Sequence, residues 1–267
     1  MQDYKISIVT EFKILETLPK LQIETWGFEP IEAVPAHVLL AAAKEAGQVL
    51  VAFDDSGEPV AFTLGFFARD SKTAKNYLLS HMLAVKPGLQ SRSIGYEMKM
   101  AQRQQALDSG LSEIRWTYDP LLTRNANLNL RKLGARVYSF IENNYGAMQS
   151  GLYGELPTDR FVVTWDLHNL TPEYFCKTDQ IALTLSSENK PLDYREDLKR
   201  ESRHYLCQVP LNHEHLRKSD TALAAQWQMT LRAISQELFN RGYAVVGFRV
   251  NKADNLGEYL FEKVQQG

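Results

Sequence analysis

The alternation of strand-like and helix-like segments is the feature that most limits what this chain can fold into. Short apolar runs, typical of strands, take turns with segments whose apolar residues recur every three to four positions, which is typical of amphipathic helices. The predicted strands are residues 5–9, 49–53, 60–67, 77–85, 114–118, 137–143 and 161–165. The predicted helices are residues 12–23, 36–45 and 125–133, with a fourth that starts at Ile94 and is ended by Gly110. This order predicts a layered α/β fold with helices packed against a sheet.

The helix that starts at Ile94 is expected to be amphipathic. The residues predicted to fall near one face are Ile94, Met98, Ala101, Gln105 and Leu107. Those predicted to lie elsewhere on the helix are Lys99, Arg103 and Asp108.

The pattern weakens after residue 166 and then becomes clear again. Residues 181–185 are a candidate strand, and the charged stretch 193–203 is interpreted as a solvated helix face. A helix is predicted over residues 219–241, capped by Ser219 or Asp220 and ended by Gly242, with an apolar stripe made by Leu223, Trp227, Leu231, Ile234 and Leu238. Strands at 243–250 and 258–262 are predicted to form a hairpin. We therefore expect a first domain over residues 1–166 and a C-terminal extension, residues 167–267, packed on it.

Composition narrows the classes of function. Hydrophobic residues make up 44% of the 267 residues, which is enough for a substantial core. The 30 Lys and Arg nearly balance the 32 Asp and Glu, and aromatic residues are not interleaved with them, so neither nucleic acid nor a membrane is an expected partner. The two cysteines, the start without an apolar leader and the lack of a membrane-length apolar run predict a soluble cytoplasmic protein without a disulfide framework.

A buried strand, a loop of small residues and a helix follow one another between Leu83 and Gly95. The N-terminus of a helix offers unpaired N–H groups and a partial positive charge, so such a loop can hold a pyrophosphate. Arg92 would add a cationic side chain. The alternative interpretation is a capped connection that binds nothing.

The residues Val85-x-Pro87-x-x-Gln90-x-x-x-Ile94-Gly95 resemble the acyl-CoA-binding signature of the GNAT acyltransferase superfamily, usually written Gln/Arg-x-x-Gly-x-Gly/Ala. Four later segments are similar to a bacterial subgroup of predicted GNAT acyltransferases: Trp116-Thr117-Tyr118-Asp119-Pro120, residues 125–135, Asn144-Tyr145-Gly146 and Asp159-Arg160. The superfamily resemblance covers about residues 1–165, and the subgroup resemblance extends to the C-terminus.

The resemblance implies a mixed, mostly antiparallel sheet that is splayed open between the strands ending at Val85 and Tyr118, with the pantetheine arm of CoA in the gap. The acyl-CoA-binding residues that it implies are Leu83, Val85, Gln90, Ser91, Arg92, Ser93, Ile94, Gly95 and Asn125. Two positions depart from the family pattern. Ser93 replaces the usual glycine, so its Cβ narrows the space near the phosphate, and Leu130 replaces the tyrosine that usually protonates the thiolate.

N-acyl transfer from a thioester needs a neutral amine, a polarised carbonyl and a proton for the leaving thiolate. A backbone N–H near residues 81–83, where the family usually has a strand bulge, can polarise the carbonyl. His81 is the candidate base, because an ordinary histidine pKa of about 6.5 suits proton collection near neutral pH. The alternative is a packed structural histidine. Tyr145 is the candidate acid, with packing as its alternative role.

Five further residues are candidates for contact with the substrate or the donor. Asp119 can anchor the substrate ammonium or form a turn with Pro120. Tyr118, Arg124 and Arg160 are expected to bind the substrate, since a guanidinium fits a carboxylate with two hydrogen bonds, whereas the alternative for the arginines is a surface ion pair. Asn125 either bonds a pantetheine amide or caps its helix.

Other motifs are weaker. His213-x-His215 with Cys207 resembles a zinc site only superficially, and no metal is expected. The chain lacks a Gly-x-Ser-x-Gly elbow, a Walker loop and a Gly-x-Gly-x-x-Gly loop, so the chemistry of hydrolases, NTPases and dinucleotide enzymes has no local support.

The expected function is an acyl-CoA-dependent N-acyltransferase. Acetyl-CoA or succinyl-CoA would react directly with the amine of a small molecule or amino acid in a ternary complex, and a homodimer is compatible with this expectation. A rival class is a non-catalytic GNAT-fold module for CoA binding or interaction, which the residues Ser93 and Leu130 favour. A third is a structural protein whose loop is only a turn.

Overall fold

The computed structural model describes residues 4–90, 93–146, 156–169, 176, 178, 180–186, 188–193, 198 and 201–264. Over these residues the chain is a mixed α/β protein whose strands pair mostly antiparallel, as expected. It divides into two compact units. The first contains Met1–Trp116 and Asp166–His168, and the second contains Thr117–Ala147, Glu155–Trp165 and Asn169–Gly267. The expected division into domains 1–166 and 167–267 stays a prediction.

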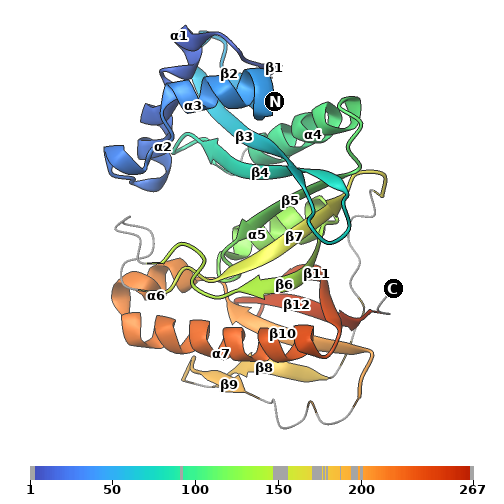
Figure 1. Ribbon diagram of the computed structural model, residues 1–267. Helices are drawn as coiled ribbons and strands as arrows, with labels where there is room; N and C mark the ends of the chain where they lie inside the picture. Colours follow the sequence, from blue (N-terminus) through green and yellow to red (C-terminus); the bar gives the residue numbers. More distant parts are fainter. Residues whose placement is uncertain are drawn as a thin grey trace. The chain divides into compact units, whose positions relative to one another are not determined.

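The strands of the first unit follow the order β1 (Lys5–Ile8), β2 (Gly47–Phe53), β3 (Pro59–Arg69), β4 (Asn76–Val85) and β5 (Glu113–Tyr118) (Figure 1). The last two residues of β5, Thr117 and Tyr118, are counted with the second unit. Neighbours from β1 to β4 are antiparallel, whereas β4 and β5 pair in parallel at Leu78↔Ile114 and Leu79↔Arg115. The later residues of β4 pair with β3 and, within the described first unit, with no residue of β5. This short parallel pairing agrees with the expected opening of the sheet between these two strands.

Helices cover both faces of this sheet. They are α1 (Phe12–Leu15), α2 (Leu18–Trp26), the 3-10 turn η1 (Pro30–Glu32), α3 (Ala36–Ala41), the π-helical turn η2 (Ala42–Ala46) and α4 (Ile94–Asp108). Val49 and Val51 of β2 pack in one cluster with side chains of α1 to α3, whereas Leu50 of the same strand packs in another with Ile94 and Met98 of α4. Successive side chains of a strand point to opposite faces, so the alternation in β2 separates the two clusters.

The single helix predicted over residues 12–23 is two helices in the structure, because α1 ends at Leu15 and α2 begins at Leu18. Pro19 is the cause. In one continuous helix its position would have to donate an N–H to the carbonyl of Leu15, which proline cannot do. In the first turn of α2 proline is tolerated, because an N–H at that position would have no acceptor within the helix.

The second unit has the strand order β7 (Arg160–Asp166), β6 (Arg136–Ile141), β11 (Tyr243–Asn251), β12 (Leu256–Lys263), β10 (His204–Pro210), β8 (Ile181–Leu185) and β9 (Pro191–Asp193). Its helical segments are α5 (Thr123–Ala126), the π-helical turn η3 (Asn127–Lys132), α6 (His213–Ser219) and α7 (Thr221–Asn240). The antiparallel contact between Val137 of β6 and Val245 of β11 joins residues from the two ends of this unit's sequence.

The C-terminal predictions are confirmed for the long helix and the hairpin. The Asp220 side chain accepts the N–H of Leu223 and caps α7, whose Trp227 and Leu231 are buried. The sequence missed β9, β10 and α6. In the charged stretch 193–203, Asp193 ends β9 and residues 201–203 lead into β10, so these ends are not helical. Leu198 lies in a 3-10 turn and is buried, and residues 194–197, 199 and 200 lie outside the described residues.

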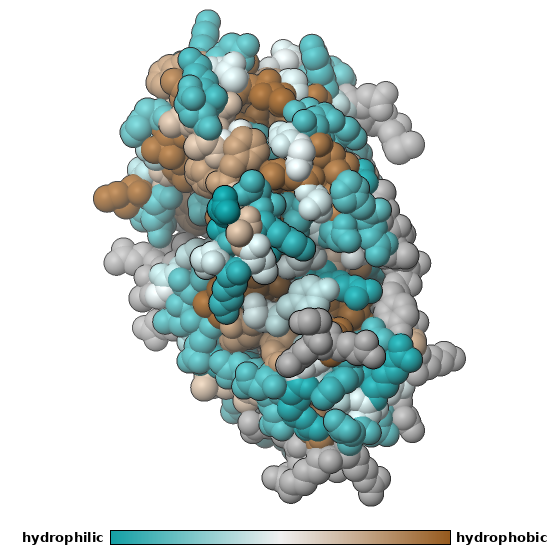
Figure 2. All heavy atoms as spheres, turned by 45° about the vertical axis from the view of Figure 1, so that its right-hand side comes forward, coloured by the Kyte–Doolittle hydropathy of each residue, from teal (hydrophilic) through white to brown (hydrophobic). Residues whose placement is uncertain are grey.

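The surface in Figure 2 mixes hydrophilic and hydrophobic residues. Exposed apolar side chains among the described residues include Phe12, Ile31 and Met229. Within the part of the chain that the structure describes, no helix is both long enough and apolar enough to cross a membrane.

Candidate functional site

A β-bulge lies at the candidate base. In the pairing of β3 with β4, Leu64 is opposite Met82 and Gly65 is opposite Ser80, so His81 is the extra residue. A bulge leaves its extra residue out of the hydrogen-bond ladder and re-aims the side chain. His81 is an exposed residue whose ring lies 5.8 Å from the Phe66 ring, and partial burial of the imidazole lowers its pKa from 6.5. The imidazole is therefore uncharged at neutral pH and able to accept a proton.

The loop after β4 turns sharply and is held by side chains. The carbonyl of Val85 accepts hydrogen bonds from Gln90 Nε2 at 3.3 Å and Thr25 Oγ1 at 3.4 Å, and Gly88 has a φ of 84°. Leu83 and Val85 are half-buried on β4, and Gln90 is exposed. Two predicted site residues, Ser91 and Arg92, lie outside the described residues.

The residue that replaces the family glycine keeps a glycine-like backbone. Ser93 has a φ of 63° and a ψ of −13°, in the left-handed region that favours glycine, and directly precedes α4. Its Oγ donates to Glu97 Oε1 at 2.6 Å. Ile94 is buried and Gly95 is half-buried in the first turn of α4. The first N–H groups of a helix have no intrahelical partner, so they remain the predicted donors to a phosphate.

Lys99 corrects the expected face of α4. It was predicted to lie away from the buried side, but its residue is 3% exposed and its Nζ donates to Ser80 Oγ at 2.7 Å and Gln102 Oε1 at 3.1 Å. The ammonium also lies 4.0 Å from the centre of the Trp116 ring, and burial lowers the pKa of Lys99 to about 7. The buried face of α4 is Ile94, Met98, Lys99, Gln102 and Ala106. The spacing of Gln102 and Ala106 after Met98 was the signal that the sequence analysis missed.

In the second unit the candidate acid and one candidate substrate residue lie together. The Tyr145 hydroxyl is 3.4 Å from Thr117 Oγ1, and the Arg160 guanidinium carbon lies 5.0 Å from the centre of the Tyr145 ring. Tyr145 is exposed and Arg160 is buried. The Tyr145 N–H donates to Thr158 Oγ1 at 2.8 Å, which fixes the backbone of this turn. Tyr145 is therefore not a packed core residue.

Asp119 occupies a buried turn. Its Oδ1 accepts the N–H of Leu121 at 2.8 Å, and its Oδ2 is ion-paired with Arg217 of α6. The contact with Leu121 agrees with the turn-forming alternative. A substrate ammonium would have to compete with Arg217 for the Asp119 carboxylate. The role as substrate anchor stays a prediction.

Two neighbouring candidates, Tyr118 and Arg124, have side-chain partners in the protein, and a third, Asn125, does not have its expected capping role. Tyr118 is buried, its hydroxyl donates to Tyr259 Oη at 3.5 Å, and burial raises its pKa well above the ordinary value. Arg124 is in an exposed ion pair with Glu214 at 3.1 Å, as its alternative interpretation states. Asn125 does not cap its helix, because Leu122 precedes α5 at the cap position.

Two other sequence motifs are structural in the described chain. Leu130, at the place of the usual tyrosine acid, is buried in η3. His213 is also buried, and its Nε2 lies 3.1 Å from the carbonyl oxygen of Ala224. Neither side chain is available at the surface.

The predicted site residues thus fall into two groups. The first unit holds His81, Leu83, Val85, Gln90, Ser93, Ile94 and Gly95 along β4 and the start of α4. The second unit holds Tyr118, Asp119, Arg124, Asn125, Tyr145 and Arg160. The first group is one continuous segment of the sequence, whereas the second joins residues from separate segments.

Comparison with known proteins identifies the fold. No family model matches the chain, and no curated protein sequence matches it significantly. The ribosomal-protein-S18-alanine N-acetyltransferase from Escherichia coli aligns with a TM-score of 0.50 at 13% identity, covering 65% of this chain and 100% of that chain. A proposed phosphinothricin N-acetyltransferase aligns with a TM-score of 0.50 at 12% identity, covering 62% of this chain and 99% of that chain.

The chain therefore has the GNAT acetyltransferase fold, as its sequence motifs predict. More than a third of the chain lies outside each of these alignments. At such low identity the likeness concerns the fold, and the activity must be argued from the site.

Proposed function

We propose that this protein is an acyl-CoA-dependent N-acyltransferase that acts on the amine of a small molecule or amino acid, with acetyl-CoA or succinyl-CoA as donor. The observation that carries the proposal is the bulge at His81, in the strand that leads through the loop to the N-terminus of α4. In a fold of the GNAT type this strand, loop and helix supply both a candidate base and candidate phosphate donors.

The chemistry follows from the groups present. A backbone N–H released from the ladder at the bulge would polarise the thioester carbonyl. His81, whose pKa is lowered, would take the proton of the substrate ammonium, so that the amine attacks the carbonyl carbon as the C–N bond forms. The C–S bond then breaks as the attacking nitrogen loses its second proton to solvent, and Tyr145 would give its hydroxyl proton to the thiolate and recover one from solvent. Arg160, beside the Tyr145 ring, would bind a carboxylate of the acceptor.

The alternative is a module that binds CoA without transfer, and Leu130 favours it. A buried leucine stands where a GNAT enzyme usually has its acid, so the proposed transfer depends on Tyr145 taking that role. The cytoplasmic location, the small-molecule acceptor and the compatibility with a homodimer stay predictions from the sequence.

Thermal unfolding with and without CoA, acetyl-CoA and succinyl-CoA tests the proposal. At about a hundred times the dissociation constant, a ligand that binds only the native state adds about 2.7 kcal/mol of stability, a shift of several degrees in a domain of this size. Pantetheine, which lacks the pyrophosphate, is the control ligand. The better acyl donor is then assayed for thiol release with a panel of amines and amino acids.

The outcomes separate the candidate functions. A shift with the nucleotide-bearing donors together with amine-dependent thiol release supports the transferase. A shift without release over the whole panel supports the CoA-binding module. No shift with CoA, acetyl-CoA or succinyl-CoA would exclude both the transferase and the CoA-binding module, and would leave a structural protein.

A further inference from the structure

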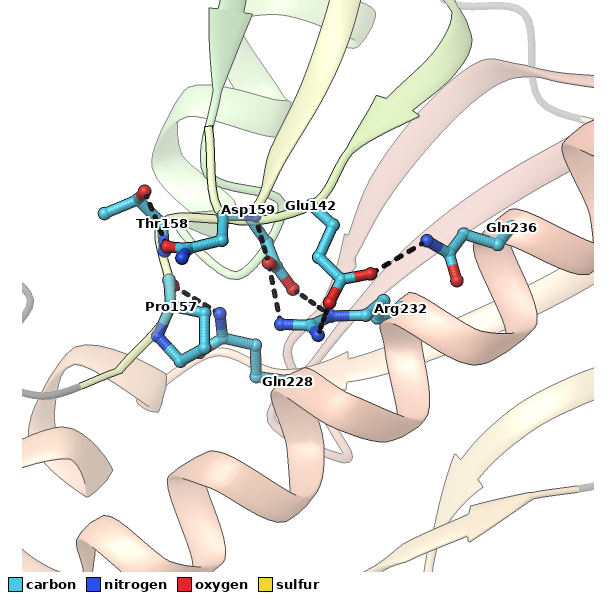
Figure 3. Close-up of polar contacts among 8 residues, drawn as sticks. Glu142, Pro157, Thr158, Asp159, Gln228, Arg232 and Gln236 are labelled. Atoms are coloured by element: carbon cyan, nitrogen blue, oxygen red, sulfur yellow. Dashed lines mark hydrogen bonds and ion pairs between the residues drawn. The ribbon is translucent and has the colours of Figure 1, made fainter. Parts of the chain in front are cut away.

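The turn that carries Tyr145 is anchored to helix α7 by one arginine (Figure 3). Arg232 Nε donates to Asp159 Oδ2 and its terminal nitrogen donates to Asp159 Oδ1, both at 2.9 Å. The other terminal nitrogen donates to Glu142 Oε1 at 2.5 Å. The guanidinium therefore joins the two chain segments that flank the turn, one after β6 and one before β7.

The contacts continue from Asp159 to the Tyr145 backbone. Asp159 Oδ1 accepts the N–H of Asn143 at 3.1 Å, and Asn143 Oδ1 accepts the N–H of Thr158 at 3.1 Å. Thr158 Oγ1 in turn accepts the N–H of Tyr145 at 2.8 Å. The Arg232 side chain is thus connected to the Tyr145 backbone through an unbroken set of hydrogen bonds.

Neighbouring turns of α7 contact the same two segments. Gln228 donates to the carbonyl of Pro157 at 2.5 Å, and Gln236 Nε2 donates to Glu142 Oε2 at 3.4 Å (Figure 3). Residues four apart lie on one helix face, so Gln228, Arg232 and Gln236 form a polar stripe toward the turn. A helix that only covered the sheet would present apolar residues there.

The ion pair between Arg232 and Asp159, which anchors the turn, is buried and has one defined geometry. Arg232 is 8% exposed and Asp159 is 3% exposed, so both ions have lost most of their water. Such a pair adds little net stability compared with apolar packing, but its two parallel hydrogen bonds define one geometry. Arg160 follows Asp159 directly and lies over the Tyr145 ring. The same anchor therefore aligns both residues assigned to the proposed site.

We propose that Arg232 is a positioning residue for the acyl transfer: from α7 it holds the turn at 142–146 so that Tyr145 and Arg160 keep their places. The C-terminal residues that carry α7 are then part of the catalytic unit. This inference rests on the proposed function.

A double-mutant cycle in kcat tests the inference. Arg232→Gln should lower kcat at least tenfold with little change in the KM for acyl-CoA, and Tyr145→Phe should lower it at least as much, on the scale of a lost general acid. If Arg232 acts through Tyr145, the double variant is no slower than Tyr145→Phe alone. Losses that multiply would overturn the inference. Arg241→Gln is the matched control, since Arg241 lies at the end of α7 and pairs with Glu237.

Amide hydrogen exchange gives a second readout that needs no activity. The Asn143 and Tyr145 amides should exchange at least tenfold faster in Arg232→Gln and at the wild-type rate in Arg241→Gln, because local opening sets exchange. Unchanged exchange in Arg232→Gln would overturn the inference whatever the activity. If the wild type transfers no acyl group, the proposed function fails, whereas faster exchange still establishes the anchor.

A second, less disruptive variant keeps the inference testable if Arg232→Gln does not fold. Glu142 is exposed, so Glu142→Gln removes the negative charge from one ion pair of Arg232 and leaves both bonds to Asp159 in place. It should fold, raise the exchange of the same two amides and lower kcat less than Arg232→Gln does. Wild-type exchange and kcat in both variants would contradict the positioning role.

Discussion

Lys99 Nζ donates a hydrogen bond of 2.7 Å to Ser80 Oγ, and Ser80 is the residue directly before the bulge at His81. The Lys99 amine therefore contacts the strand that bears the candidate base. Both hydrogen-bond acceptors of this ammonium, on Ser80 and Gln102, are neutral. Burial with no carboxylate partner among the described residues disfavours the charged form, which is why the pKa of Lys99 falls to about 7.

Lys99→Met should raise the stability at neutral pH and change its pH dependence. Between pH 7 and 10.5 the unfolded chain holds the Lys99 proton and the folded protein does not, so this group makes wild-type stability rise with pH over that window. The rise amounts to on the order of 3 kcal/mol between pH 7 and 10, at 1.36 kcal/mol per pKa unit. The Lys99→Met variant lacks this rise in stability with pH.

The measurement is the difference between wild type and variant in the free energy of unfolding by urea at each pH. Burial raises the pKa values of Cys207 and Tyr118, which lowers stability above about pH 9, but these contributions cancel in the difference. Lys75→Met, at an exposed lysine, should show no pH-dependent difference. A flat difference for Lys99→Met would mean that Lys99 stays charged when folded.

Ser93→Gly should be more stable than Ser93→Ala by about 1 kcal/mol, because only the alanine keeps a Cβ at a left-handed φ. Both variants lose the hydrogen bond to Glu97, so the comparison isolates the backbone strain. Urea unfolding measures it. Equal stability of the two variants would mean that the backbone relaxes out of the left-handed region.

His81→Ala should lower turnover at least tenfold and leave the CoA dissociation constant nearly unchanged, on the scale of a lost general base. The lowered pKa of His81 also places the acid limb of the wild-type kcat/KM profile below pH 6.5. His37→Ala, at an exposed histidine of α3, is the matched control. Near-normal turnover would remove His81 from the mechanism.

Asp119→Asn should cost about 3 kcal/mol of stability, because it removes the carboxylate from an ion pair with Arg217 whose two side chains are 8% and 7% exposed. Arg124→Gln breaks an ion pair whose side chains are 56% and 45% exposed, and should cost less than about 1 kcal/mol. Urea unfolding compares them. A raised KM for the amine with stability intact would instead support Asp119 as the substrate anchor.

Local sequence patterns predicted most elements of the fold. The apolar stripe of α7, its cap at Asp220 and the hairpin of β11 and β12 depend on residues within a few turns of one another, and all are confirmed. The prediction of one helix over residues 12–23 is wrong because Pro19 divides this segment into two helices. β10 was missed because charged residues precede it, although its own residues are mostly buried.

The chain's own residues therefore determined its α/β class, its principal helices and the strand, loop and helix that suggest acyl-CoA, because hydrophobic period, caps and turns are local properties. The tertiary structure decided which buried polar groups have partners. Asp119 meets Arg217, and Asp159 meets Arg232, across long separations in sequence. The partner of a buried charged side chain depends on which residues the fold places beside it. Hydrophobic periodicity cannot predict such pairs, because it reports only on residues close in sequence.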